Sequence, residues 1–225
     1  MISARNITKK FGNVSALVDV SLDINPGEFI FLTGASGSGK TTLLRIFLRE
    51  LLPDKGTLTI DGVDIAKISQ RKLPLYRRSL GMVFQDFKML NDRNVFENVS
   101  LPLEVGGTKF PDIINKVKKS LELVGLTAKN DLFPAQLSGG ELQRVAIARA
   151  IVASPKLILA DEPTGNLDPK TARGIVKLLQ SIHGDLKTTI IMATHNADIV
   201  NANAQRVVNL DEGKVVKDSP KGKYE

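Results

Sequence analysis

The stretch FIFLTGASGSGKTTLLRIFL, residues 29–48, constrains the fold of this chain more than any other. It joins a dense apolar strand to a glycine-rich loop and then to a predicted helix at residues 41–51, whose apolar residues recur with helical spacing. The loop, GASGSGKT, matches the phosphate-binding pattern G-x-x-x-x-G-K-[ST] in full. A chain of this length matches that pattern by accident roughly one time in a hundred, and less often in this strand, loop and helix context. We therefore expect an α/β fold built around a phosphate-binding loop.

Each residue type in this phosphate loop, residues 34–41, has a physical reason to be there. Backbone amides from Ser36 to Thr41 are expected to wrap a β-phosphate, with the Lys40 ammonium on the β- and γ-phosphate oxygens. The Thr41 hydroxyl is expected to ligate Mg²⁺. A merely flexible glycine turn would explain neither the lysine nor the threonine. The residues that we expect to bind a nucleotide here are Gly34, Ala35, Ser36, Gly37, Ser38, Gly39, Lys40, Thr41 and Thr42.

Further apolar runs predict the strands of the fold. Two of them, at residues 156–161 and 188–193, are uninterrupted, as expected for central parallel strands that are covered on both faces. The segment 206–217 reads as an antiparallel hairpin closed by Asp211-Glu212-Gly213. The remaining predicted strands span residues 4–11, 20–24, 29–33, 56–60 with an Asp-Gly turn after it, and 81–84.

The predicted helices lie mostly in one stretch of the chain. Between Asp86 and about Ser154 the pattern is helical, with few β-branched runs and with breaks at Pro102 and Pro134. Residues 169–182 also have helical spacing, and no repeat, linker or low-complexity tract separates the parts. We therefore predict one domain over residues 1–225, an α/β unit with a helical subdomain inserted at about 86–154.

The composition is ordinary for a globular chain and excludes several classes of protein. Of the 225 residues, 42% are hydrophobic and 24% are charged, which is far from the composition of disordered chains. The absence of cysteine excludes disulfides and thiolate metal sites. The longest apolar runs fall far short of the ~20 residues that cross a bilayer, and the N-terminus lacks the apolar core of a signal peptide. We expect a soluble, non-exported protein whose membrane link, if any, runs through a partner.

The net charge of +7 is spread along the chain rather than gathered in one block. Basic residues occur at 71–78, at 116–119 and in a lysine-rich C-terminal end. Solvated faces with a mild attraction to anionic surfaces explain such a spread better than nucleic-acid binding does. We expect no direct nucleic-acid partner.

Two acids follow the buried run LILA at residues 157–160. Asp161 emerges at the carboxyl end of the predicted strand, where α/β sheets place their ligands, and is suited to holding Mg²⁺ through water. Glu162 is one residue further on and is assigned as the general base that polarises an attacking water. The alternative for Glu162 is a capping acid before Pro163.

Three further side chains are candidates because of where they lie in the pattern. His195 follows the strand at 188–193 and is placed to reach a γ-phosphate, with a polar loop residue as the alternative. Gln85 follows the strand at 81–84, where its amide is able to ligate Mg²⁺ or hold the attacking water. Phe11 precedes a glycine and is either an adenine-stacking ring or a core residue. His183, before Gly184, reads as an ordinary surface residue at the end of a helix.

A second anion-binding pattern lies in LSGGELQRVAIARA, residues 137–150. Ser138-Gly139-Gly140 leaves backbone amides uncovered at the start of an apolar-periodic segment, which places them at the positive end of a helix. That geometry suits a phosphate. One short chain therefore contains two phosphate cradles.

Taken together, these residues resemble the nucleotide-binding subunits of ATP-binding-cassette (ABC) transporters over essentially the entire chain. The family's motifs occur here in the family's order, as Phe11, the phosphate loop, Gln85, the signature LSGGE, the strand ending at Asp161, Glu162, Asn166-Leu167-Asp168 and His195. The resemblance implies an α/β P-loop ATPase of the ABC type. Its mostly parallel core sheet would carry an N-terminal antiparallel β subdomain and an inserted α-helical subdomain.

The resemblance also implies the ligands and the roles of the site residues. The cofactors are ATP and Mg²⁺, with Thr41, Gln85 and Asp161 at the metal and with Glu162, His195 and Gln85 in catalysis. In this family two copies pack head to tail, so Ser138, Gly139 and Gly140 of one copy face the γ-phosphate of the other, and Asp168 joins the nucleotide site. The second cradle thus serves the partner's ATP in an ATP-dependent homodimer. Glu141 departs from the glutamine usual in the family, and we expect activity to be retained.

Within the family, DEPTGNLD at residues 161–168 resembles the lipoprotein-releasing, macrolide-exporter and cell-division branch. The stretch 73–90 is most similar to the branch's cell-division ATPases. That similarity implies an integral membrane partner, a place at the cytoplasmic face of the membrane, and control of cell-wall hydrolases at the division site. Exporter-type ATPases and a slow, soluble ATP-dependent dimerisation switch remain the alternatives. Phe87, Met89 and Leu90 are either the socket for the partner or core.

Overall fold

The computed structural model describes residues 1–224. The chain divides into two units: residues 1–77 together with the C-terminal stretch from residue 189, and residues 78–188. We call them the first and the second unit and describe each by itself. Among the described residues, none of the helices combines the length and the apolar character needed to cross a membrane.

The first unit contains an antiparallel sheet with the strand order β2-β1-β4-β5. Its strands are β1 (Ile2–Phe11), β2 (Val14–Ile24), β4 (Lys55–Ile60) and β5 (Val63–Asp64). The first two are longer than the predicted pieces. Asn6 and Asp19 have positive φ, and the β1–β2 register shifts along the hairpin. These irregularities interrupt the alternation of apolar and polar residues from which strand length was predicted.

A second group of strands in the first unit has the order β10-β9-β3-β8. Strands β3 (Phe29–Thr33), β8 (Thr189–Ala193) and β9 (Arg206–Asp211) run parallel, and β10 (Lys214–Ser219) pairs antiparallel with β9. Every residue of β3 and β8 is buried, which explains their uninterrupted apolar sequence. The predicted C-terminal hairpin is confirmed, with Glu212 and Gly213 at positive φ in its turn.

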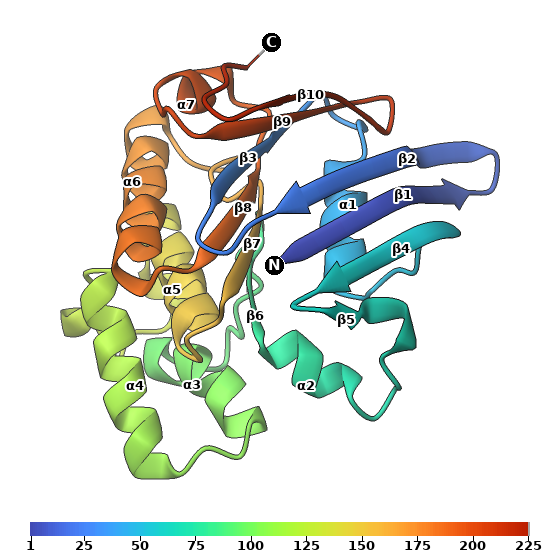
Figure 1. The fold of residues 1–225 in the computed structure, drawn as a ribbon. Coiled ribbons are helices and arrows are strands. Elements are labelled where there is room, and N and C mark those ends of the chain that lie inside the picture. Colours follow the sequence, from blue (N-terminus) through green and yellow to red (C-terminus); the bar gives the residue numbers. More distant parts are fainter. Residues whose placement is uncertain (225) are drawn as a thin grey trace. The chain divides into compact units, whose positions relative to one another are not determined.

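Short helices complete the first unit (Figure 1). Helix α1 (Lys40–Phe47) packs against β2, and η1 (Ile65–Lys67), α2 (Leu73–Arg78) and α7 (Ala197–Asn201) follow other strands. The apolar pattern extended α1 to Leu51, which is wrong. Arg49 has a φ of 56° and its amide bonds to the Ile46 carbonyl, so the helix has ended.

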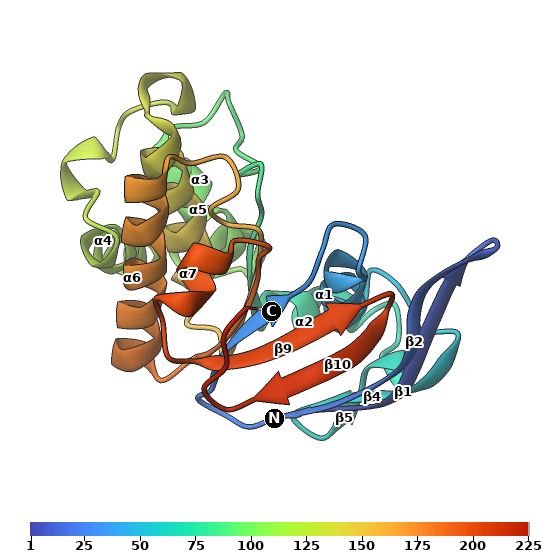
Figure 2. The same ribbon diagram turned by 90° about the horizontal axis from the view of Figure 1, so that it is seen from above.

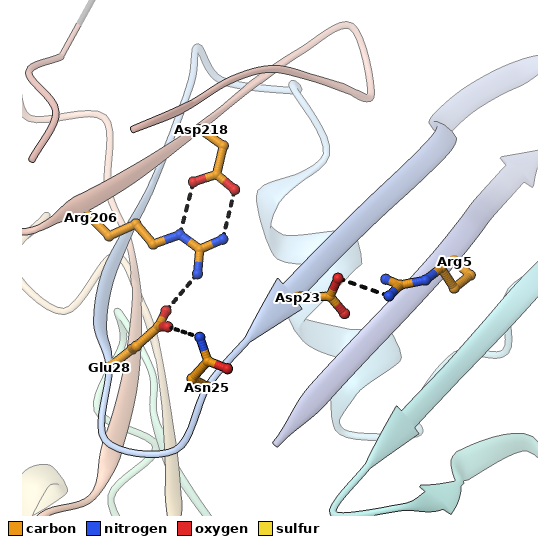
Figure 3. Close-up of polar contacts among 6 residues, drawn as sticks. All are labelled: Arg5, Asp23, Asn25, Glu28, Arg206 and Asp218. Carbon is orange, nitrogen blue, oxygen red and sulfur yellow. Dashed lines mark hydrogen bonds and ion pairs between the residues drawn. The ribbon is translucent and has the colours of Figure 1, made fainter. Parts of the chain in front are cut away.

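An ion-pair network fixes the turn that leads into β3 (Figure 3). The Arg206 guanidinium of β9 donates to both carboxylate oxygens of Asp218, at 2.8 and 2.6 Å, and to Glu28 at 2.5 Å. Glu28 also accepts a hydrogen bond from Asn25 at 2.6 Å. The fork of Arg206 thus joins β9, β10 and the turn before β3. Asp218, and then Glu28, raise the pKa of Arg206 above its usual range.

The second unit pairs two parallel strands with a group of helices, and Figure 2 shows these helices together. Strand β6 (Leu80–Val83) lies beside β7 (Leu157–Asp161). Helix α5 (Gly139–Ile151) packs against β6 and against α3 (Val95–Val105), α4 (Phe110–Leu123) and α6 (Pro169–Leu186). The single-turn helices η2 (Thr127–Lys129) and η3 (Pro134–Gln136) join α4 to α5. The α/β class and the parallel character of the buried strands are confirmed.

Two predicted helix boundaries in this unit are wrong. Pro102 lies inside α3 rather than breaking it, because packing of buried residues such as Val99 and Leu103 outweighs one missing amide hydrogen bond. Helix α6 continues past Ile182 to Leu186. His183 therefore does not end the helix, and its Nδ1 lies 2.8 Å from the Thr188 carbonyl oxygen.

Candidate functional site

The phosphate loop follows β3 and has a backbone that only glycine adopts readily. Gly34, Gly37 and Gly39 have φ values of 139°, 81° and 104°. The Ser38 amide closes a turn onto the Ala35 carbonyl at 3.2 Å. Gly39 is the N-cap of α1, and no side chain among the described residues caps the helix. The first amides of α1 therefore remain suited to an anionic ligand at the positive end of the helix.

Neighbouring strands of the first unit hold this loop in place. A Cβ on Gly34 would overlap the Leu210 carbonyl oxygen of β9, and one on Gly39 would lie 2.5 Å from the Ala16 carbonyl oxygen of β2. The Gly213 amide donates to the Ser38 carbonyl at 3.1 Å, and the Gly213 carbonyl accepts from Val18 at 2.8 Å. Sequence reasoning missed Gly213. Its only signal was its place in a hairpin turn, which says nothing about a partner so far away in the chain.

Two buried side chains of the phosphate loop fit a phosphate ligand. Lys40 is 6% exposed, and its ammonium donates to the Gly34 and Ala35 carbonyl oxygens at 2.8 and 2.9 Å, so it spans the loop. Ser38 is 4% exposed, and its hydroxyl has no hydrogen-bond partner among the described residues. A buried hydroxyl in that position needs a ligand or a water to satisfy it.

Phe11 ends β1 and is 47% exposed, so it is not a core residue. The Lys9 ammonium lies 5.6 Å from the centre of the ring and also pairs with Asp54 at 2.8 Å. A ring held from one side by a cation presents an apolar surface for a planar ligand. The stacking of adenine on Phe11 stays a prediction.

His195 lies just beyond β8, the strand beside β3. Leu32 pairs with Ala193 in parallel register, and the Thr194 amide donates to the Leu32 carbonyl at 3.0 Å. Because parallel neighbouring strands end at one edge, His195 and the phosphate loop start from the same edge of the sheet. His195 is exposed there.

In the second unit, Asp161 ends β7 and Glu162 follows it with a φ of 48°. A left-handed backbone costs about 1–2 kcal/mol for a residue other than glycine, and such strain is concentrated at functional sites. The Glu162 carbonyl accepts from the Gly165 amide at 3.0 Å. The alternative role of Glu162 as a helix cap is not observed, since Asp168 caps α6.

The segment after β6, Gln85–Leu90, is bonded to the segment Asn166–Asp168. We call them the Q segment and the D segment. The Asn166 amide group donates to the Gln85 carbonyl at 3.2 Å, and the Gln85 amide group donates to Asn166 Oδ1 at 3.5 Å. A side chain at Gly165 would come within 2.9 Å of the Gln85 amide. These contacts join two predicted motifs of the second unit, and no sequence pattern indicated them.

Arg149, near the end of α5, clamps the Q segment and was not predicted as a functional residue. Its guanidinium donates to the Phe87 carbonyl at 2.6 Å and to the Lys88 carbonyl at 2.8 Å. Phe87 and Lys88 both have positive φ, so the clamp holds an unusual backbone conformation. Burial lowers the pKa of Arg149.

The signature loop, Ser138–Glu141, forms the start of α5. The Ser138 side chain caps the helix, and the Glu141 carboxylate accepts a hydrogen bond from the Ser138 amide, which completes a capping box. A pocket of about 560 Å³ opens here. It is lined by the signature loop, the D segment and the first turns of α6. A Cβ on Gly140 would lie 2.6 Å from Thr171 Cγ2, so a larger residue there would displace the Thr171 side chain.

Asp168 lines the same pocket and caps α6. Its carboxylate accepts hydrogen bonds from the Lys170 and Thr171 amides at 3.0 and 3.1 Å. Hydrogen bonds from Thr171, side chain first, lower the pKa of Asp168. The predicted role of Asp168 in binding a nucleotide is therefore combined with a structural one.

The donor set predicted for Mg²⁺ is chemically suitable. A threonine hydroxyl, an amide and a carboxylate supply the hard oxygen ligands that this ion prefers, with water and phosphate oxygens completing its shell. Thr41 lies in the first turn of α1, whereas Gln85 comes after β6 and Asp161 ends β7 in the second unit.

Comparison with known proteins agrees with the motifs. The family model described as ABC transporter matches residues 17–165. The chain is 48% identical over 225 residues to the cell division ATP-binding protein FtsE of Streptococcus pneumoniae, covering 100% of this chain and 97% of the relative. It is 46% identical to the FtsE of Bacillus subtilis at 100% and 98% coverage. A methionine import ATP-binding protein, MetN 1 of Paraburkholderia xenovorans, is 44% identical over 97% of this chain but only 64% of its own length.

Solved structures give the same assignment. The dimeric structure of MJ0796, a bacterial ABC transporter cassette, is 35% identical with a TM-score of 0.88, and each chain covers 100% of the other. A structure of the same cassette in a post-hydrolysis state with ADP and Pi has a TM-score of 0.87. The chain belongs to the ABC transporter family, in which it is an ATP-binding and ATP-hydrolysing subunit.

Proposed function

We propose that this ABC ATPase drives a cell-division complex. It would bind a membrane protein of the FtsX type at the cytoplasmic face of the membrane and, through it, regulate cell-wall hydrolases. The observation that carries the proposal is the similarity to FtsE proteins over the whole chain and nearly the whole of each relative. The entire chain would act as one ABC nucleotide-binding domain, with no direct contact to nucleic acid.

The phosphate loop would bind the chain's own ATP. Its amides and Lys40 would hold the phosphates, Phe11 would stack on adenine, and Thr41 would ligate Mg²⁺ with Gln85 and Asp161. Glu162 would accept a proton from the attacking water, and His195 would contact the γ-phosphate. The buried Ser38 hydroxyl and the strained backbone of Glu162 support these roles.

The signature loop would bind the γ-phosphate of a second copy. Its amides start a helix beside an open pocket, which suits an anion that arrives from outside the second unit. ATP would then hold two copies together head to tail, and hydrolysis would release them. The dimeric structures of MJ0796 support this arrangement by similarity.

The Q segment would form the socket for the membrane partner. Phe87 and Met89 are half-buried and Leu90 is exposed, so none of the three belongs to the buried core. Phe87→Asp tests this role without straining the backbone, because aspartate tolerates the positive φ found there. We expect unchanged basal ATPase activity and loss of binding to the partner. Complex formation at the wild-type level would remove the socket from the proposal.

The experiment for the whole proposal uses Glu162→Gln, which is expected to bind ATP without hydrolysing it. The variant is isolated from native membranes in the presence of ATP, and the proteins retained with it are identified. Lys40→Ala is the matched control, since it is also inactive but is expected to lose ATP binding. An FtsX-type protein retained by the first variant and not by the second is the expected result.

Other outcomes redirect the assignment. A permease of a lipoprotein-releasing, macrolide-exporting or methionine-importing system would move the protein to that branch. Recovery of no membrane protein, together with an ATP-dependent dimer, would favour a soluble switch instead.

A further inference from the structure

The signature loop contains an acid beside the group that is proposed to bind a phosphate. Glu141 Oε2 accepts hydrogen bonds from the Ser138 amide and from the Ser138 hydroxyl, both at 2.9 Å. The Glu141 amide in turn approaches Ser138 Oγ at 3.4 Å. The carboxylate is therefore in direct contact with the hydroxyl through which the loop would contact the γ-phosphate of a partner copy.

This contact creates two difficulties for binding an anion. A serine hydroxyl has one hydrogen, and here that hydrogen is donated to Glu141 rather than directed at a ligand. In addition, a carboxylate close to a phosphate repels it, and the repulsion grows as water leaves the interface. A glutamine side chain at position 141 would hold the Ser138 hydroxyl less strongly than the carboxylate does, and it would repel the phosphate less.

Lys129 offsets both effects. Its ammonium, at the end of η2, forms an ion pair with Glu141 Oε1, the oxygen that does not contact Ser138. The two oxygens of Glu141 are thus divided between a cation and the serine. Lys129, followed by Ser138, lowers the pKa of Glu141 to about 2, so the pair is charged on both sides and carries no net charge at neutral pH.

The backbone of this segment places Lys129 for that role. The Lys129 amide donates to the Leu126 carbonyl at 2.9 Å, which forms the η2 turn. The Val124 carbonyl at the end of α4 accepts from Arg144 of α5 at 2.8 Å. The link between α4 and α5 is therefore anchored to the same helix that carries Glu141. Arg144 and Lys170 also line the pocket, where they offset the charges of Glu141 and Asp168.

We propose that Lys129 is a positioning residue of the signature loop, which neutralises Glu141 and weakens its hold on the Ser138 hydroxyl so that this hydroxyl can turn to a partner's γ-phosphate. Lys129 itself does not contact the nucleotide. The inference rests on the proposed role of the signature loop in the dimer, and it makes the Lys129–Glu141 pair the replacement for the glutamine usual in the family.

The test is a double-mutant cycle in a Glu162→Gln background, in which ATP persists. Lys129→Met, Glu141→Gln and the combination are compared by the protein concentration at which ATP produces half-maximal dimer in sedimentation experiments. Lys129→Met is expected to raise that concentration roughly tenfold, because an unpaired carboxylate then faces the phosphate. Glu141→Gln is expected to lower it or leave it unchanged. The combination should match Glu141→Gln alone, since no charge then remains to be neutralised.

Three controls separate positioning from loss of structure. Binding of a fluorescent ATP analogue to the monomer should be unchanged in Lys129→Met. Lys129→Arg should restore dimerisation. Arg5→Met removes an exposed cation that pairs with Asp23 at 2.8 Å, and should leave dimerisation as in the parent. With Glu162 restored, Lys129→Met should lower the steady-state rate at limiting protein concentration and regain it when the protein is concentrated.

The outcomes that overturn the inference are distinct from those that overturn the proposed function. If Lys129→Met dimerises like the parent, or if adding Glu141→Gln does not rescue it, Lys129 has no positioning role. If Ser138→Arg dimerises normally with ATP, the signature loop does not bind the partner's nucleotide, and the head-to-tail dimer in the proposed function fails. Loss of dimerisation in Ser138→Arg with none in Lys129→Met rejects only the inference.

Discussion

The chain builds two loops for an anion in two different ways. In the phosphate loop, three glycines have a backbone that other residues avoid, and a Cβ at Gly34 or Gly39 would collide with carbonyl oxygens of neighbouring strands. In the signature loop, Gly139 and Gly140 have ordinary helical geometry, and a serine and a glutamate form a capping box. The first loop is enclosed by its own unit, whereas the second opens into a pocket at the surface.

This difference indicates which of the two loops tolerates substitutions without loss of the fold. A loop that encloses a ligand must bring its backbone close to that ligand, and only glycine permits such a close approach. A loop that presents amides to a ligand from outside needs only the uncovered first turn of a helix. Mutations in the two loops should therefore change different measured properties. In the phosphate loop they should change ATP binding by the monomer and the free energy of unfolding, whereas in the signature loop they should change hydrolysis with little effect on either.

The largest expected effect separates binding from hydrolysis. Lys40→Ala and Ser138→Arg should each lower the rate of ATP hydrolysis by at least about 10²-fold, because the first removes the cation that would hold the phosphates and the second replaces the hydroxyl that would contact the γ-phosphate with a bulky side chain. Lys40→Ala should also lose ATP binding by the monomer, while Ser138→Arg should retain it within about twofold. Titration with a fluorescent ATP analogue, alongside phosphate release, distinguishes the two. Equal loss of monomer binding in both variants would contradict the assignment of the loops to different nucleotides.

The next largest effect is on stability. It compares Gly39 and Gly139, each of which lies at the start of a helix that follows one of the two loops. Gly39→Ala should lower the free energy of unfolding by about 2–4 kcal/mol, since its φ is 104° and its Cβ would meet the Ala16 carbonyl oxygen at 2.5 Å. Gly139→Ala should change it by no more than about 1 kcal/mol, because its Cβ would make an ordinary 3.5 Å contact with Leu167. Urea unfolding at neutral pH measures both. A similar cost at the two positions would show that backbone strain is not what distinguishes the loops.

A smaller effect on stability is expected near the C-terminal end of α5, the helix that begins with the signature loop. Arg149→Met should lower the free energy of unfolding by about 1–3 kcal/mol, because two carbonyl oxygens in the strained Q segment lose a charged donor. Amide hydrogen exchange should accelerate in the Q segment and stay unchanged in the signature loop. Arg149→Lys is the control that keeps the charge without the fork, and should fall between methionine and wild type. Unchanged exchange in the Q segment would mean that Arg149 does not hold it.

The smallest effect is a dependence on pH. Lys129 and Ser138 lower the pKa of Glu141 from 4.5 to about 2, so the folded state holds the charged form more strongly than the unfolded chain does. That contribution is fully present above about pH 4.5 and is lost as the pH falls towards 2. Solvent screening limits it to under about 1 kcal/mol. Urea midpoints between pH 5 and pH 2.5 should therefore fall less steeply in Glu141→Gln than in wild type, and parallel curves would contradict the assignment.

Several features followed from the sequence because they depend on local chemistry. The order of strand, glycine loop and helix at residues 29–48 predicts the phosphate loop, and the uninterrupted run at residues 188–193 predicts a buried parallel strand. The helix predicted after Ser138 begins where the apolar pattern begins. The extent of β1 and β2, and of α1, was predicted less well, because bulges and a left-handed residue at Arg49 leave no trace in apolar spacing.

The sequence by itself determined that this protein is an ATPase of the ABC type, and it supplies the side chains that are predicted to contact phosphate, metal and water, together with their order along the chain. Only the tertiary structure decided how those groups are held. Gly213 closes against the phosphate loop, Arg149 clamps the Q segment, and Lys129 pairs with Glu141. The physical reason is that a local pattern fixes backbone geometry and residue type, whereas a hydrogen bond or an ion pair between distant segments exists only once the chain has closed around its core.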